Sequence, residues 1–142
     1  MNLLESLELE RYKLLIDRQK YYTGLAKDAF GSYTKLLTGL AAGGIALVST
    51  RTRLEIRPTV LLYLVDGIVY LVTFLGVIAS AQIVFCLARW WDCRHAELKM
   101  NSNSPAIRWW WWLFESLYVV AILFSIAVTW HMADELPLVL AP

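Results

Sequence analysis

Of the 142 residues in the chain, 58% are apolar and only 18% carry a charged side chain, and the mean hydropathy is +0.52. This composition argues for a membrane protein and against an ordinary soluble globular domain. The formal net charge is only +1. The basic excess that binds a phosphate backbone is therefore missing, and no nucleic-acid partner is expected.

Residues 1–35 form a polar segment that contains no proline. Apolar or aromatic side chains recur in this segment and just beyond it, mostly at steps of three and four, at Leu9, Tyr12, Ile16, Ala26, Phe30, Tyr33 and Leu37. This spacing predicts a long helical stalk in the cytoplasm that is continuous with the first membrane span. The alternative is an amphipathic helix that lies on the membrane and bends near Gly24 or Gly31. Charges on several faces of the helix favour the stalk.

Three apolar stretches predict an all-α domain over residues 36–131, with transmembrane helices at about 36–50, 59–88 and 109–131. In the second stretch the uncharged run 67–88 alone spans roughly 33 Å as a helix. Its apolar side chains outweigh the cost of about 3 kcal/mol for inserting Asp66. The first stretch is short, at about 22 Å of helix, and it reaches bilayer thickness only if it extends backwards with Lys35 snorkelling. Whether it spans or re-enters stays open.

The basic side chains predict the orientation of the chain. Of the 13 Lys and Arg residues, six precede the first predicted span, three lie between the first and second spans, and four lie between the second and third. The positive-inside rule therefore places the N-terminus in the cytoplasm and residues 132–142 outside, as a short tail. We expect the plasma membrane of a bacterial-type cell, its inner membrane. A re-entrant first stretch leaves a similar bias, so charge does not separate the two topologies.

Tryptophans flank the second and third spans, next to Arg89 and Arg108. They predict interfacial anchors in the bilayer at Trp90, Trp91, Trp109, Trp110, Trp111 and Trp112. A flat ligand-binding platform is disfavoured, because successive residues of a helix point in different directions.

Polar side chains recur at helical spacing along the second and third predicted spans, so each of these helices carries a polar stripe. Lipid does not tolerate such stripes, so both stripes must face protein or water. The functional interpretation is a hydrated path enclosed by several copies of the chain, with Asp66 and Glu115 near its two mouths setting cation preference. The predicted pore-lining residues are Asp66, Tyr70, Thr73, Ser80, Glu115, Tyr118, Ser125 and Thr129. The alternative is that these groups only form hydrogen bonds within a helix bundle.

The first span contains a small-xxx-small pattern, in which helix backbones can approach closely. The predicted helix-packing residues are Gly39, Ala42, Gly43 and Ala46. The pattern does not distinguish contact between copies from contact within one chain.

No nucleophile, oxyanion loop or phosphate-binding glycine motif is visible, so an enzyme is not expected. Between the second and third spans, ligand-type side chains occur in a predicted loop, at Asp92, Cys93, His95 and Glu97. Their spacing matches no known metal site, so no metal or cofactor is expected. An enzyme that uses this cluster is the weakest alternative.

Together these features predict a small multi-pass protein that forms homo-oligomers, because a chain this small needs copies to enclose a path. The assembly is expected to be an ion channel or a membrane-permeabilising pore. The cytoplasmic helix is expected to control it, and a cytoplasmic protein partner can bind there. The alternative function is a structural membrane-anchor subunit of a larger complex.

Overall fold

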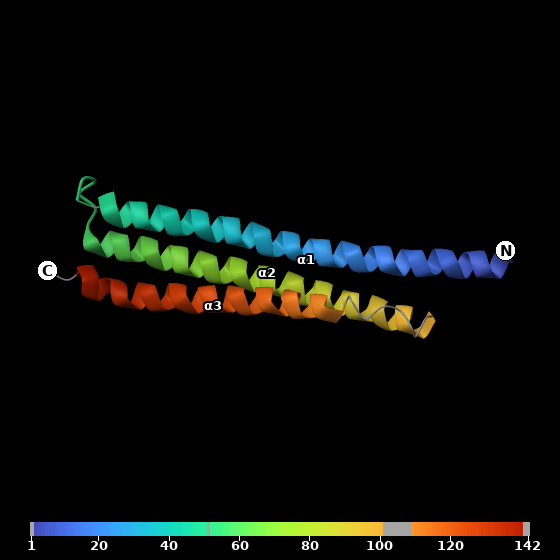
Figure 1. Cartoon of the computed structure of the whole chain (residues 1–142). Helices are drawn as coiled ribbons and strands as arrows, with labels where there is room; N and C mark the ends of the chain where they lie inside the picture. The colour runs from blue at the N-terminus through green and yellow to red at the C-terminus, as the bar shows by residue number, and fades with distance from the viewer. Residues whose placement is uncertain (1, 51, 101–108, 141–142) are drawn as a thin grey trace.

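A computed structural model of the chain contains three helices, α1 (Leu3–Thr50), α2 (Pro58–Met100) and α3 (Trp109–Leu140), and describes residues 2–50, 52–100 and 109–140. The helices run side by side with α2 in the middle, and neighbours along the chain are antiparallel (Figure 1). The prediction of an all-helical chain is therefore confirmed for the described residues. Within them, α2 and the Trp112–Pro137 part of α3 are long and apolar enough to cross a membrane. The first predicted span, 36–50, does not pass that test.

Helix α1 is unbroken through Gly24 and Gly31, as the absence of proline predicts. Its buried side chains, Gln19, Ala26 and Tyr33, follow one another at steps of seven residues. A seven-residue step keeps one seam of a helix against its neighbour, as in a coiled coil. The predicted continuity between the N-terminal helix and residues 36–50 is confirmed.

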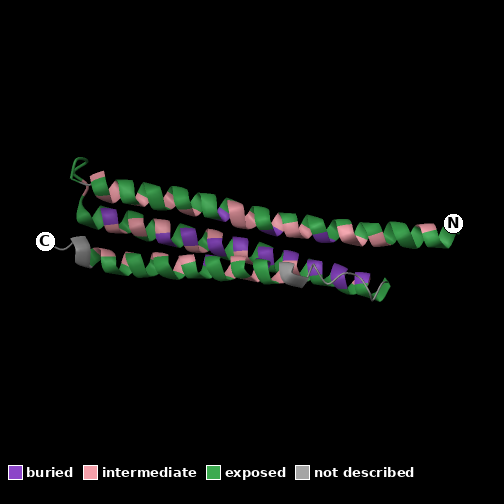
Figure 2. Cartoon of the chain, in the orientation of Figure 1, coloured by how far each residue is buried: buried purple, intermediate pink, exposed green. Residues whose placement is uncertain are grey.

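Helix α2 carries the matching seam at alternating steps of three and four. The seam consists of Val69, Val72, Gly76, Ala79, Ile83, Cys86, Trp90, Cys93 and Glu97, all buried. Figure 2 shows this burial concentrated on the middle helix. The seam continues past residue 88 as far as Glu97, which contacts Gln19 of α1. This packing against α1 keeps residues 89–100 helical. The prediction of a loop at residues 89–100 is therefore wrong, because these residues are the last turns of α2.

Helix α3 continues to Leu140, beyond Pro137, so most of the predicted tail 132–142 is helical. It packs tightly against α2 at Gly76. A Cβ atom at that glycine would lie 2.6 Å from Ile126 Cδ1 and 3.2 Å from Ile122 Cγ2. Ile122 is fully buried and belongs to the core in which all three helices meet, together with Ala26, Tyr33, Ala79, Ile83 and Cys86.

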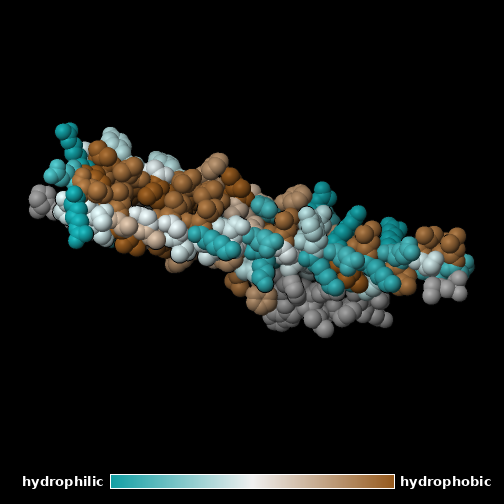
Figure 3. All heavy atoms as spheres, turned by 90° about the horizontal axis from the view of Figure 1, so that it is seen from above, coloured by the Kyte–Doolittle hydropathy of each residue, from teal (hydrophilic) through white to brown (hydrophobic). Residues whose placement is uncertain are grey.

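The molecule has an apolar half and a polar half. In Figure 3 apolar side chains cover most of the half next to the α1–α2 connection, whose tip is itself hydrophilic, whereas hydrophilic side chains predominate toward the N-terminus of α1. We call residues 3–22 of α1 and 89–100 of α2 the arm. The arm is made of the polar ends of α1 and α2, so its position is coupled directly to the rest of these two helices.

Candidate functional site

Four of the predicted pore-lining residues make contacts between helices of the same chain, and one of them is Tyr70 on α2, whose ring meets that of Trp130 on α3 edge to face with centroids 5.5 Å apart. Thr73 on α2 accepts a hydrogen bond from Trp130 Nε1 at 2.8 Å. Ser125 on α3 lies 2.7 Å from the Tyr33 hydroxyl of α1, oxygen to oxygen. The ring of Tyr118 stacks on that of Phe30, with centroids 4.4 Å apart and planes inclined by 14°. These groups have the packing role that the alternative interpretation assigns to the stripes.

The members of the stripes do not share one face. Asp66 and Tyr70 lie on the exposed surface of α2, and Tyr70 is 64% exposed. Thr129 donates to the Ser125 carbonyl of its own helix. The Ser80 hydroxyl is buried without a partner among the described residues. A single chain therefore encloses no path along the eight residues. Only Asp66 and the exposed part of the Tyr70 side chain, whose ring also contacts Trp130, can line a path between copies.

Glu115 is the most unusual of the eight, because its carboxylate is buried between α1 and α3. The residue is 2% exposed, and neither Oε1 nor Oε2 has a hydrogen-bond partner in the described structure. It lines a pocket of about 300 Å³ with Thr23, Lys27, Phe114 and Tyr118. A buried carboxylate without a donor is costly, so this pocket is a candidate ligand site.

A second buried polar group lies inside the arm and was not predicted. Glu97 accepts hydrogen bonds from Gln19 Nε2 at 2.5 Å, from the Tyr12 hydroxyl at 3.4 Å and from Arg94 Nη1 at 3.0 Å. Gln19, Arg94 and Glu97 are all nearly fully buried. We call these four residues the arm cluster. Because a buried ion pair requires well-placed partners, the cluster fixes the register of α1 on α2.

The ligand-type residues of the expected loop are dispersed around helix α2. Glu97 belongs to the arm cluster, Cys93 is buried, and His95 is exposed beside the Trp91 ring. Within the described ranges, no group of three His, Cys, Asp or Glu residues has a geometry that could hold a metal ion.

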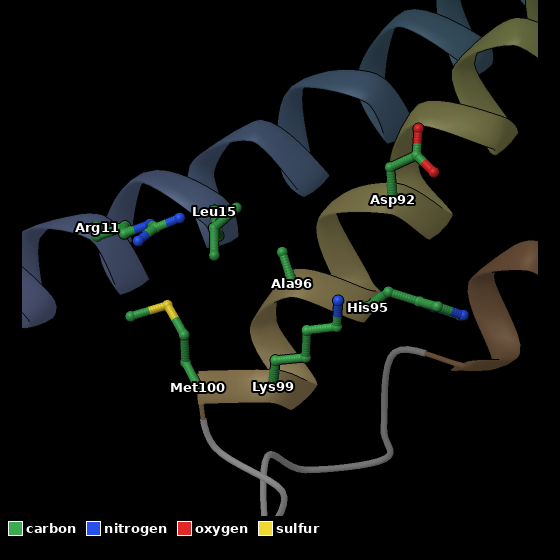
Figure 4. A pocket seen from close by; sticks show the side chains of 7 residues that line it. All are labelled: Arg11, Leu15, Asp92, His95, Ala96, Lys99 and Met100. Carbon is green, nitrogen blue, oxygen red and sulfur yellow. The ribbon is translucent and has the colours of Figure 1, made fainter.

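A pocket of about 520 Å³ opens between the two helices of the arm. Figure 4 shows Arg11 of α1 facing Met100 of α2, with Lys99 beside it and His95 directed away from Arg11. Asp92 also lines the pocket. Its charged side chains are all exposed, so nothing in it is held in place for a particular ligand.

The small residues of α1 take no part in packing within the chain. Gly39, Ala42, Gly43 and Ala46 are all exposed, and a Cβ atom at Gly39 or Gly43 would meet nothing within 4 Å. This face of α1 is therefore free for contact with another helix.

The predicted tryptophan anchors whose side chains the structure describes divide into two groups. Trp90 is 2% exposed and lies in the α2 seam, inside the chain. Trp91 meets Trp112 of α3 with ring centroids 6.4 Å apart, which marks one level shared by both helices. The side chains of Trp109, Trp110 and Trp111 lie outside the described part of the structure.

A groove between α1 and α2, with a mainly apolar lining that includes three polar side chains, was also missed at the sequence level. Asp28, Ser32 and Gln82 are exposed and line one pocket, at the level where the helices of the core meet. Gln82 departs from the polar stripe of α2, and that departure was the signal that could have revealed the groove.

No protein-family model, curated protein or solved structure matches the chain.

Proposed function

We propose that the protein is a multi-pass membrane protein that assembles with copies of itself and conducts ions along the exposed Asp66–Tyr70 face of α2. The observation that carries this proposal is the position of Asp66, an exposed carboxylate in the apolar half of the molecule. A carboxylate that faces hydrocarbon costs about 3 kcal/mol. Contact with a second copy that keeps Asp66 hydrated removes that cost and places a negative charge beside the path.

The contacts of α1 with α3 support a third span. Phe30 stacks on Tyr118 and Tyr33 contacts Ser125, so these α1 residues lie beside the apolar part of α3. Residues 24–50 of α1 then supply about 40 Å of helix at membrane depth. This part carries three charged side chains. Lys27 and Lys35 are exposed and long enough to snorkel, and Asp28 lines the groove between α1 and α2. We propose that the arm lies in the cytoplasm of a bacterial-type cell and controls the assembly.

The free small-residue face of α1 supports self-association. Helices in lipid associate through close backbone approach, which small side chains permit. Because a Cβ atom added at Gly39 or Gly43 would meet nothing within 4 Å, this face is open within one chain, and a second copy is the partner we assign to it.

The test is ion flux in vesicles that contain the purified protein, read as the potential that develops across a potassium gradient. Asp66→Asn keeps the shape of the side chain and removes its charge, so we expect cation flux or cation selectivity to fall. The matched control is Asp134→Asn on α3, which should conduct like the wild type. Cross-linking shows in parallel whether each variant still assembles. Wild-type vesicles without flux, or an Asp66→Asn variant with unchanged flux and selectivity, would refute conduction along this face.

A structural anchor subunit is the second candidate, and the arm supplies the observation that favours it. Leu3, Leu7 and Leu14 are each more than half exposed on α1, while the arm cluster holds α1 rigidly on α2. An exposed apolar patch on a rigid polar arm is typical of a protein–protein contact. Under this alternative, Leu7→Asp combined with Leu14→Asp leaves helix content unchanged but releases the chain from a larger complex in native gels of its own membranes.

A further inference from the structure

The pocket around Glu115 contains a combination of groups that the proposed function does not use. Its inner wall is a buried carboxylate with two unpartnered oxygens, and Lys27 of α1 lines the same pocket. In the described structure, no ion pair joins this lysine to the carboxylate. The Thr23 hydroxyl lies close to the Glu115 carboxylate, but it donates its one proton to the Gln19 carbonyl of its own helix. The described residues therefore leave the Glu115 carboxylate without a hydrogen-bond donor, and a bound ligand would have to supply one.

The walls of the pocket indicate what kind of donor fits. Phe114 and Tyr118 contribute aromatic rings. Phe30 covers one face of the Tyr118 ring, and an uncovered aromatic face attracts a cation that binds a nearby carboxylate. A primary ammonium has three N–H donors, enough for both carboxylate oxygens. Lys27 adds a positive charge at the same pocket, which suits a phosphate attached to that ammonium.

The position of the pocket indicates where such a ligand comes from. Glu115 follows Trp112 by three residues, about 4.5 Å along the helix, and Trp112 meets Trp91 at the level where tryptophans lie among lipid headgroups. Phe114 and Leu117 on the outside of α3 are 57% and 54% exposed, which offers apolar surface for acyl chains. Lys27 and Phe114 are exposed, so rotation of these two side chains opens the pocket.

We propose that this pocket binds the headgroup of a phospholipid that carries a primary ammonium, phosphatidylethanolamine in chemical class. Glu115 receives the ammonium and Lys27 receives the phosphate. The inference rests on the proposed placement of α3 in a membrane. It requires neither self-association nor conduction, so it can fail or succeed independently of them.

The experiment is native mass spectrometry of the full chain released from detergent micelles that contain phosphatidylethanolamine or phosphatidylcholine with identical acyl chains. We expect the wild type to retain phosphatidylethanolamine about tenfold more strongly, since the trimethylated headgroup cannot donate to the carboxylate. Glu115→Gln should reduce this preference to near unity. The matched control is Glu135→Gln, at an exposed carboxylate on the same helix, and it should keep the preference.

Lys27→Ala provides a second variant that changes only an exposed side chain, so it keeps the proposal testable if Glu115→Gln does not fold. It should weaken retention of phosphatidylethanolamine by about tenfold. Equal retention of both lipids by the wild type, or an unchanged preference in folded Glu115→Gln, would overturn the site. Displacement of the lipid by millimolar free phosphoethanolamine would show that the soluble headgroup is the ligand, and would overturn the assignment to a lipid.

Discussion

Gly76 is the position at which an added side chain should most strongly disturb the contact between α2 and α3. A Cβ atom there would lie 2.6 Å from Ile126 Cδ1, 3.1 Å from Ile126 Cγ1 and 3.2 Å from Ile122 Cγ2. Valine places three carbons in this space, and overpacking of this kind costs about 1–3 kcal/mol. Valine gains only a few tenths of a kcal/mol over glycine in helix propensity. Gly76→Val should therefore lower the free energy of unfolding by about 2 kcal/mol, roughly 30-fold in the equilibrium constant.

The assay is reversible unfolding in mixed micelles with a rising fraction of sodium dodecyl sulfate, followed by circular dichroism. Gly67→Val is the matched control in the same helix, because a Cβ atom at Gly67 meets nothing within 4 Å. Its effect should stay within about 0.5 kcal/mol. Ile126→Ala should recover part of the loss in the Gly76→Val background, since it removes the nearest atoms. No loss at Gly76, or an equal loss at Gly67, would refute the close approach of α2 and α3.

Two further predictions concern polar contacts between helices. Glu97→Ala leaves Arg94 buried without its carboxylate, so the arm should lose about 3 kcal/mol of stability. Amide hydrogen exchange in residues 89–100 should then accelerate, whereas the exposed Glu5→Ala control should not change it; unaltered exchange in Glu97→Ala would contradict a stabilising arm cluster. In a double-mutant cycle, Tyr33→Phe and Ser125→Ala should show a coupling energy of about 0.6 kcal/mol in the unfolding assay. Strictly additive effects would exclude the hydrogen bond between α1 and α3.

The sequence predicts that the helices exist, but it does not predict where each of them ends. The absence of proline and the apolar spacing from Leu9 to Leu37 predict the unbroken helix α1. The end of α2 could not be located from hydropathy, which falls at Arg89, because packing against α1 extends the helix to Met100. The α2–α3 contact depends on Gly76, which contributes little to hydropathy and still permits close approach of α3.

The candidate site was predicted in residue type but not in arrangement. Periodicity identified Asp66 and Thr73 as members of one stripe, yet the rotation of α2 exposes the carboxylate and turns the threonine toward Trp130. Rotation depends on which neighbour a helix meets, and a single sequence does not specify that neighbour. The bond between Gln19 and Glu97 joins residues 78 positions apart. No local pattern connects two such distant positions.

Because α1 is one unbroken helix, a tilt at one of its ends also moves the other end. A helix of 48 residues is about 72 Å long, and roughly 30 Å of it precedes the level of Trp112. A tilt of about 10° around that level would move the N-terminal tip by about 5 Å and the opposite end by about 7 Å in the reverse direction. Force applied to the exposed leucines of the arm would thus reach the far side of the helix bundle without any change in secondary structure.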